Sequence, residues 1–268
     1  MDAGALSGGV AQGLDGAGRL AACAARGEVL VVVAWHAASP SEADGEGGVK
    51  LHWECAPPGG RETLDRIGAH PDLKPFVLAG GTALALQEGH RSSADYDFFA
   101  VSPGLTLPSL RRFRGDQLRP PGGRVRSEAR GTLHAELGGI LLSFLVTGSP
   151  WLRRPRRFGS FRLAHPVDIG LMKLGAIIQR GSRRDFIDLA CILDRHAGLD
   201  RLLRLARRRY PDVRDIVPQA LQALVYFADA DRDRDPPRLV PQYGWERVKA
   251  AVEAHTRKAA GKLLARPR

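Results

Sequence analysis

Two carboxylates and a glycine turn lie close together in the chain and could carry metal-assisted phosphate chemistry. Asp95 and Asp97 are two residues apart in an apolar stretch that reads as a strand, so both side chains would point to the same face. Upstream, the apolar run 76–79 leads into a Gly-Gly-Thr turn at residues 80–82, followed by a helical segment. Backbone N–H groups at such a turn bind phosphate, and paired carboxylates hold divalent metals against triphosphates. The pattern indicates nucleotidyl transfer.

Each of these residues also has a purely structural alternative. Asp95 and Asp97 could form a solvated strand end, but Asp is depleted in strands, and two beside Phe98 are costly without a cation. The metal role is therefore favoured. Ser93 would share the face of Asp95, where its hydroxyl could bind a phosphate oxygen or satisfy the turn. Arg91 could bind phosphate or pack on an acidic residue.

A second candidate segment lies downstream, on two predicted helices. Lys173 sits in an otherwise apolar helix, where it could reach solvent or face a ligand. Asp185 could cap the helix that follows. Asp188, three residues on, is expected to be a surface charge that pairs with Arg184 or Arg195.

Together the two segments, residues 76–99 and 165–189, resemble the AbiEii/AbiGii toxin family of the polymerase-β-like nucleotidyltransferases. The first matches the family pattern GGTALAL…GHR-S-x-D-x-D-F, and the second its Lys followed by an Arg and an Asp-Phe-x-Asp. The resemblance begins near residue 49 and runs toward the C-terminus. It implies a metal-dependent enzyme with Mg²⁺ or Mn²⁺ as cofactor and a nucleoside triphosphate (NTP) as substrate. The implied catalytic residues are Asp95, Asp97, Lys173 and Asp185; the nucleotide-binding residues are Gly80, Gly81, Thr82, Arg91, Ser93 and Lys173; the metal ligands are Asp95 and Asp97.

The resemblance further implies the toxin of a type IV toxin–antitoxin pair, which adds nucleotides to RNA, with the tRNA 3′ end the best candidate acceptor. A cognate antitoxin protein is then an expected partner. Two alternatives stay open: a nucleotidyltransferase that modifies a protein or small molecule, and a catalytically inactive nucleic-acid-binding relative.

The chain departs from the wider superfamily at one position. Many of these enzymes carry a third carboxylate on a later strand, and the corresponding strand here offers Ser143. Glu136 on the preceding strand is a candidate substitute, and Asp185 could fill part of the role by orienting or deprotonating the acceptor. The departure leaves the general base for the acceptor hydroxyl open.

The elements that must position these residues form an α/β (α+β) chain: a mixed sheet with flanking helices in residues 49–165, then an α-helical lobe in residues 166–268. Periodicity predicts strands at 76–79 and 96–101, and a hairpin over 131–146 that turns at a Gly-Gly pair. It predicts helices at 61–67, 82–88, 103–112, 167–180, 184–195, 199–208, 213–228 and 243–264.

Composition narrows the class of protein. The 268 residues carry a net charge of +11, which favours a polyanionic partner. Two stretches, 111–130 and 151–157, interleave aromatics with arginine and read equally well as an RNA-binding strip or a solvated face. Three scattered cysteines and the absence of a long apolar run predict a cytoplasmic protein without a membrane partner.

The first 48 residues differ from the rest. They are rich in Gly, Ala and Ser and hold two basic and six acidic side chains, so the basic character belongs to residues 49–268. We expect residues 1–48 to be a flexible extension, and hypothesise that translation begins at Val49.

Overall fold

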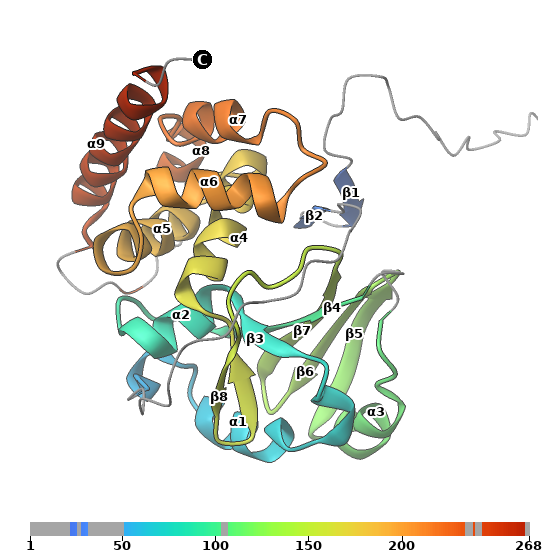
Figure 1. Ribbon diagram of the computed structural model, residues 1–268. Coiled ribbons are helices and arrows are strands. Elements are labelled where there is room, and N and C mark those ends of the chain that lie inside the picture. The colour runs from blue at the N-terminus through green and yellow to red at the C-terminus, as the bar shows by residue number, and fades with distance from the viewer. Residues whose placement is uncertain are drawn as a thin grey trace, which may run out of the picture.

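Seven strands form one mixed sheet in the part of the chain that the computed structural model describes: residues 22–25, 28–31, 51–102, 107–233, 238 and 243–265 (Figure 1). The strand order is β5-β6-β7-β4-β3-β9-β8. β4 runs parallel to β7, β3 runs parallel to β9, and the other neighbours are antiparallel. The strand bounds are β3 Val77–Ala79, β4 Asp95–Val101, β5 Gly123–Ala129, β6 Thr132–Leu137, β7 Ile140–Thr147, β8 Arg156–Phe158 and β9 Phe161–Leu163.

Helices cover this sheet unevenly. α1 (Gly60–Gly68) and α3 (Arg111–Gln117) lie at the lower side in Figure 1, while α2 (Gly80–Glu88) lies between the sheet and the later helices. The later helices are α4 (Pro166–Gln179), α5 (Arg183–Arg195), α6 (Leu199–Arg209), α7 (Ile216–Ala223), α8 (Ala228–Asp231) and α9 (Trp245–Leu264). α4 contacts α2, α5, α6 and α7, so it joins the sheet's own helix to the helical lobe.

Strand β4 separates the core from the polar side of the sheet. Its alternate residues Tyr96, Phe98 and Ala100 are buried, while Asp95 and Asp97 face the other way and are half-buried. This period-2 alternation places both carboxylates on one face, as the sequence predicts. Beneath the sheet, Phe144 of β7 packs against Phe98 at a ring-centroid distance of 5.2 Å. Its ring also contacts Phe76 and Phe113 edge-on at 5.3 Å each.

A buried ion pair fixes the connection from the sheet to the helices. Asp168 of α4 accepts the backbone N–H groups of Leu152 and Arg153, and Arg209 of α6 donates to it at 2.9 Å. Arg209 also donates to the Pro150 carbonyl. The guanidinium lies 5.4 Å from the centroid of Trp151, so this aromatic packs on the protein rather than standing free for a nucleobase.

The predicted elements recur with three differences. One helix was expected at residues 103–112. Residues 103–106 are not described, and residues 107–110 are not helical. The helix found in this region is α3, Arg111–Gln117. Its start is fixed from afar, because the Asp72 carboxylate accepts the N–H groups of Arg112 and Phe113. The hairpin of β8 and β9 was not predicted, and the helix expected at 213–228 is the shorter α7, Ile216–Ala223, with α8 beginning only at Ala228.

The expected flexible extension, residues 1–48, and the proposed start at Val49 lie largely outside the described residues. Within that segment the backbone of β1 (Ala22–Ala25) pairs antiparallel with β2 (Glu28–Val31). In the described ranges, no helix combines the length and the apolar character needed to cross a bilayer.

Phe144→Ala should lower the free energy of unfolding by about 3–5 kcal/mol, because the side chain is fully buried among three aromatic rings and its loss leaves a cavity. Urea titration of both proteins measures this. Phe158→Ala, at the half-buried edge strand β8, is the control and should cost clearly less. Equal losses would contradict the placement of Phe144 at the centre of the core.

Candidate active site

A cavity of about 330 Å³ lies where the polar face of the sheet meets α2, α4 and α5. Of the nine residues predicted to form the site, all but Gly80 line it. They come from segments far apart in the sequence, and they are Gly81, Thr82, Arg91, Ser93, Asp95, Asp97, Lys173 and Asp185. The fold therefore gathers both sequence motifs around one opening.

The glycine turn is shaped by the charged groups packed against it. Gly80 has φ +68°, and a Cβ there would lie 2.7 Å from Oδ2 of Asp97. A Cβ on Gly81 would overlap Nη2 of Arg91. Side chains at either position would displace a charged group of the site, so both glycines are needed for close approach.

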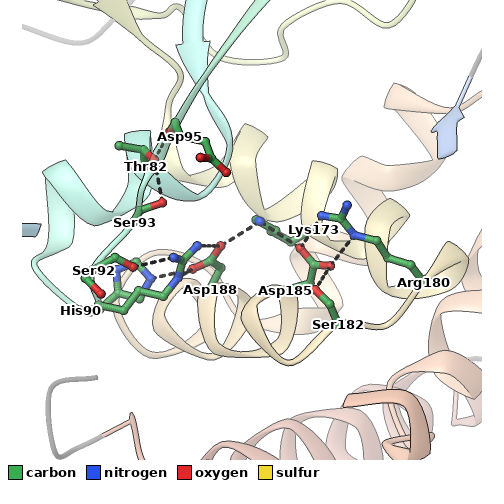
Figure 2. Close-up of polar contacts among 11 residues, drawn as sticks. Thr82, His90, Ser92, Ser93, Asp95, Lys173, Arg180, Ser182, Asp185 and Asp188 are labelled. Carbon is green, nitrogen blue, oxygen red and sulfur yellow. Dashed lines mark hydrogen bonds and ion pairs between the residues drawn. The ribbon is translucent and has the colours of Figure 1, made fainter. Parts of the chain in front are cut away.

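Thr82 and Ser93 tie this turn to the start of β4. The Thr82 hydroxyl donates to the Asp95 carbonyl and lies 2.6 Å from the Ser93 hydroxyl (Figure 2). Thr82 is buried, whereas Ser93 is half-buried at the cavity. The contacts favour a structural task for Thr82; phosphate binding by either hydroxyl stays a prediction.

The paired carboxylates suit a hard divalent cation. Strand register sets Asp97 opposite Ala79 on β3 and Ser143 on β7. Mg²⁺ is commonly held by one or two carboxylates together with substrate phosphates, and Asp95 and Asp97 offer that donor set on one face. The position where a third carboxylate was sought indeed holds Ser143, whose hydroxyl lies 3.2 Å from Nδ1 of His134.

Lys173 lies at the centre of a row of alternating charges. Its ammonium is 3.0 Å from Oδ1 of Asp185 and 2.8 Å from Oδ2 of Asp188 (Figure 2). Burial lowers the pKa of Lys173, but Asp188 and Asp185 outweigh it and raise the pKa above its usual value. An ammonium has three N–H donors, and these two contacts leave a third for a ligand in the cavity.

Asp188 is the residue whose position the sequence did not predict. The expected surface pairing with Arg184 or Arg195 is wrong, because Asp188 is fully buried. It accepts from His90 at 2.7 Å and from Nε and Nη2 of Arg91 at 2.6 and 2.8 Å, and it contacts Lys173. Burial raises its pKa, but Arg91 and Lys173 hold the pKa well below its usual range. A buried carboxylate needs such partners, since an unpaired one is strongly destabilising.

Arg91 is bound to this carboxylate through two parallel contacts, and its Nη1 donates to the Ser92 carbonyl. Two roles were open to Arg91, and in the structure it packs on an acidic residue, Asp188. Phosphate binding by Arg91 stays a prediction.

Asp185 is also surrounded by donors. Lys173, Arg180 and the Ser182 hydroxyl contact its two oxygens at 3.0, 3.0 and 2.7 Å (Figure 2). Burial raises its pKa, but Lys173 and Arg180 lower the pKa to about 2. A carboxylate with so low a pKa is a weak base, which favours an orienting role over deprotonation of the acceptor.

Six further polar residues line the cavity without having been predicted as site residues: Arg126, Ser127, His134, Ser143, Arg180 and Arg184. Arg180 was the visible signal, since it belongs to the downstream motif. Arg184, in the first turn of α5, lies in the same downstream segment. The others lie on β5, β6 and β7, and the strand register brings them to the cavity. Glu136, the candidate substitute carboxylate, contacts Arg124 and Arg126 and does not line the cavity.

Comparison with known proteins agrees with this geometry. The family model for the nucleotidyl transferase AbiEii toxin, type IV toxin–antitoxin system, matches residues 62–140, which contain the glycine turn and both β4 carboxylates. An uncharacterized protein of Aquifex aeolicus (strain VF5), aq_aa25, is 37% identical over 177 residues, which span 63% of this chain and 82% of that protein. The chain belongs to the AbiEii nucleotidyltransferase family.

Membership of the AbiEii family confirms the family predicted from the two motifs, and the seven-stranded mixed sheet confirms the predicted fold class. Two solved nucleotidyltransferase structures show remote likeness to the chain. A putative nucleotidyltransferase from H. pylori is 19% identical with a TM-score of 0.42, covering 76% of this chain and 94% of that one. MenT4, nucleotidyltransferase toxin Rv2826c from Mycobacterium tuberculosis H37Rv, is 17% identical with a TM-score of 0.46, covering 74% and 82%. The family assignment does not depend on either.

Gly81→Ala should lower the free energy of unfolding by roughly 1–3 kcal/mol, because the added methyl displaces Arg91 from Asp188. Gly261→Ala in α9 is the matched control. Nothing lies within 4 Å of its Cβ position, so the change should stabilise the protein by about 0.5–1 kcal/mol through helix propensity. Thermal or urea unfolding gives both values; a neutral G81A would show that Arg91 can move without cost.

Acid should destabilise this AbiEii protein through Asp185. Because its folded-state pKa is depressed from 3.8 to about 2, the carboxylate stabilises the fold above its unfolded pKa, and this contribution is lost as the pH falls from about 4 to 2. The loss attributable to Asp185 is on the order of 2 kcal/mol. Asp185→Asn should be less stable at pH 7 and show a shallower acid slope in urea titrations between pH 5 and 2. The exposed Asp65→Asn should keep the slope of the unmodified protein, and an unchanged slope in D185N would refute the assignment.

Proposed function

We propose that this protein transfers a nucleotide from an NTP to RNA, with the tRNA 3′ end as the acceptor, and acts as the toxin of a type IV toxin–antitoxin pair opposed by a cognate antitoxin. The observation that supports this most is the convergence of the glycine turn, the Asp95–Asp97 pair and Lys173 on a single cavity. Family membership supports the nucleotidyltransferase activity and the toxin class.

The reaction requires an acceptor hydroxyl to attack the α-phosphorus of the NTP. A new oxygen–phosphorus bond forms, the hydroxyl proton passes to solvent, the bond to the bridging oxygen of the β-phosphate breaks, and pyrophosphate leaves with that electron pair. Such transfers need positioning and charge neutralisation more than covalent participation by the protein. The site offers both.

Charge neutralisation falls to three groups. Asp95 and Asp97 would hold Mg²⁺ or Mn²⁺, which when bound acts as a Lewis acid on the phosphate oxygens. Lys173 is held charged and oriented by Asp185 and Asp188, with one N–H left for the triphosphate. The backbone N–H groups at the start of α2, beside Gly80 and Gly81, would receive phosphate oxygens.

One observation favours a second candidate, a catalytically inactive relative that only binds nucleic acid. Ser143 stands where a third carboxylate was sought, and Asp185 is a weak base. The intact Asp95, Asp97 and Lys173 argue against loss of turnover, because a protein that only binds has no need of a metal and triphosphate site.

Asp95→Asn and Asp97→Asn should each reduce nucleotide transfer roughly 10³-fold or more, because each removes a charge that holds the cation. The assay incubates the full chain with Mg²⁺, each α-labelled NTP in turn and total bacterial RNA, and follows label into a tRNA-sized band. Asp116→Asn, an exposed carboxylate on α3, is the control and should retain activity.

The outcomes separate the candidates. Label that enters RNA with the unmodified protein but not with the two variants supports the proposal and identifies the nucleotide. Metal-dependent NTP binding without transfer to RNA points to a protein or small-molecule acceptor. RNA binding without NTP binding points to the inactive relative.

A further inference from the structure

Strand β5 contains an irregularity at the cavity wall. In its register with β6, Arg124 lies opposite Glu136, Val125 opposite Ala135, and Ser127 opposite His134. Arg126 is therefore an extra residue that has no residue opposite it on β6. Such a β-bulge redirects side chains and occurs frequently beside active sites. Here Arg126 and Ser127, which would face opposite sides of a regular strand, both line the cavity.

A carboxylate holds the redirected arginine in place. Nε of Arg126 donates to Oε2 of Glu136 at 2.7 Å, and its Nη2 also contacts that oxygen. Arg124 donates to the same oxygen from its Nε and Nη2 at 3.3 and 3.0 Å. Two guanidinium groups on one carboxylate leave this trio with a net positive charge. Arg126 is about half exposed and lines the cavity, whereas Arg124 does not line it.

The strand order places Arg126 far from the proposed triphosphate site. Along the sheet, the glycine turn follows β3 on one side of β4, and β5 lies three strands away on the other side. At about 4.8 Å per strand, β5 is roughly 14 Å from β4. Lys173 of α4 also lies on the α2 side, since α4 contacts α2. The cavity thus has one cationic wall at the glycine turn and another at β5, with Asp95 and Asp97 between them.

In a nucleotidyl transfer, the attacking hydroxyl and the leaving pyrophosphate lie on opposite sides of the reacting phosphorus. If the pyrophosphate occupies the wall of the glycine turn and Lys173, the acceptor arrives from the wall of β5. We propose that Arg126 binds a backbone phosphate of the acceptor, so that the acceptor is a polynucleotide strand with a phosphodiester close to its reacting hydroxyl. This inference rests on the proposed function for the direction of the reaction, but its binding test does not.

The planar guanidinium suits this task. It can give a phosphate two parallel N–H contacts, which an ammonium cannot, and Glu136 limits the rotamers it must lose on binding. An uncharged small-molecule acceptor would gain nothing from Arg126. The chemistry of this wall therefore favours a phosphate-bearing strand over an uncharged acceptor.

The test compares two arginines that share one carboxylate. Arg126→Ala and Arg124→Ala each remove one guanidinium partner of Glu136, but only the first removes a cation that lines the cavity. The probe is a fluorescently labelled, single-stranded 12-nucleotide RNA with a free 3′ hydroxyl, titrated by anisotropy over a range of salt concentrations. Equilibrium binding of Mg²⁺-NTP is measured in parallel, and thermal unfolding checks that each variant is folded.

Arg126→Ala should weaken RNA binding roughly tenfold and reduce the slope of log K against log salt by about 0.7, the value of one phosphate contact on a single strand. Its NTP affinity should be unchanged. Arg124→Ala should stay within about twofold of the unmodified protein in RNA affinity. Arg126→Lys, which keeps the charge, should restore most of the salt slope but not all of the affinity.

A second test replaces single phosphates of the RNA probe with uncharged linkages. Uncharged methylphosphonate linkages are introduced one at a time over the last four nucleotides of the probe. At the linkage that Arg126 contacts, the unmodified protein should lose affinity and R126A should lose nothing further. A structural role for Arg126 would not produce this selective coupling.

Three results would overturn the proposal: equal RNA affinities and salt slopes for R126A and R124A, a selective loss of NTP binding in R126A, or no RNA binding by the unmodified protein. Selective RNA effects in R126A with no nucleotide transfer by any variant would leave this proposal standing while the proposed function fails. Transfer to RNA with no difference between R126A and R124A would support the proposed function and contradict the role given to Arg126.

Discussion

The site depends on the contacts that the buried carboxylate of Asp188 makes with His90, Arg91 and Lys173. This carboxylate joins three parts of the chain: the loop before β4 through His90 and Arg91, α4 through Lys173, and its own helix α5. Its charge could not be buried without these partners, and Arg91 and Lys173 are in turn buried charges that need it. The requirement is mutual, so the loop, the two helices and the glycine turn beneath Arg91 have one mutually compatible arrangement. The cavity is the space that this arrangement leaves.

A consequence is that the site is organised before any ligand arrives. Lys173 is held between Asp185 and Asp188, Thr82 is tied to the start of β4, and Arg209 fixes the connection into the helices. Preorganised charge avoids the reorganisation cost that a flexible site would meet during the reaction. The glycine turn takes part in this organisation, because glycine is the only residue type at position 81 that lets the Arg91–Asp188 pair lie against the backbone.

The sequence predicted what is local and missed what depends on distant pairing. Asp95 and Asp97 could be placed on one face because strand alternation needs only neighbouring residues, and the Gly-Gly-Thr turn is equally local. Lys173 and Asp185 required the family resemblance. Asp188 was placed at the surface because its partner Arg91 is 97 residues away, and nothing in the helix pattern reveals such a contact. Arg126 was missed because a bulge adds one residue and shifts the alternation of β5, and the start of α3 was misplaced because Asp72 caps it from 40 residues away.

Strand β5 also has a consequence for the behaviour of the whole molecule in solution. It is the terminal strand of the sheet, and such strands present unpaired backbone groups to which another chain can add and begin aggregation. A bulge and exposed charges at Arg124, Arg126 and Glu128 are among the features by which proteins prevent this addition. Arg126, which lines the cavity, is therefore also one of the residues that protect this sheet edge from pairing with another chain. A change that neutralises Arg126 would therefore alter both the charge of the cavity and the protection of this edge.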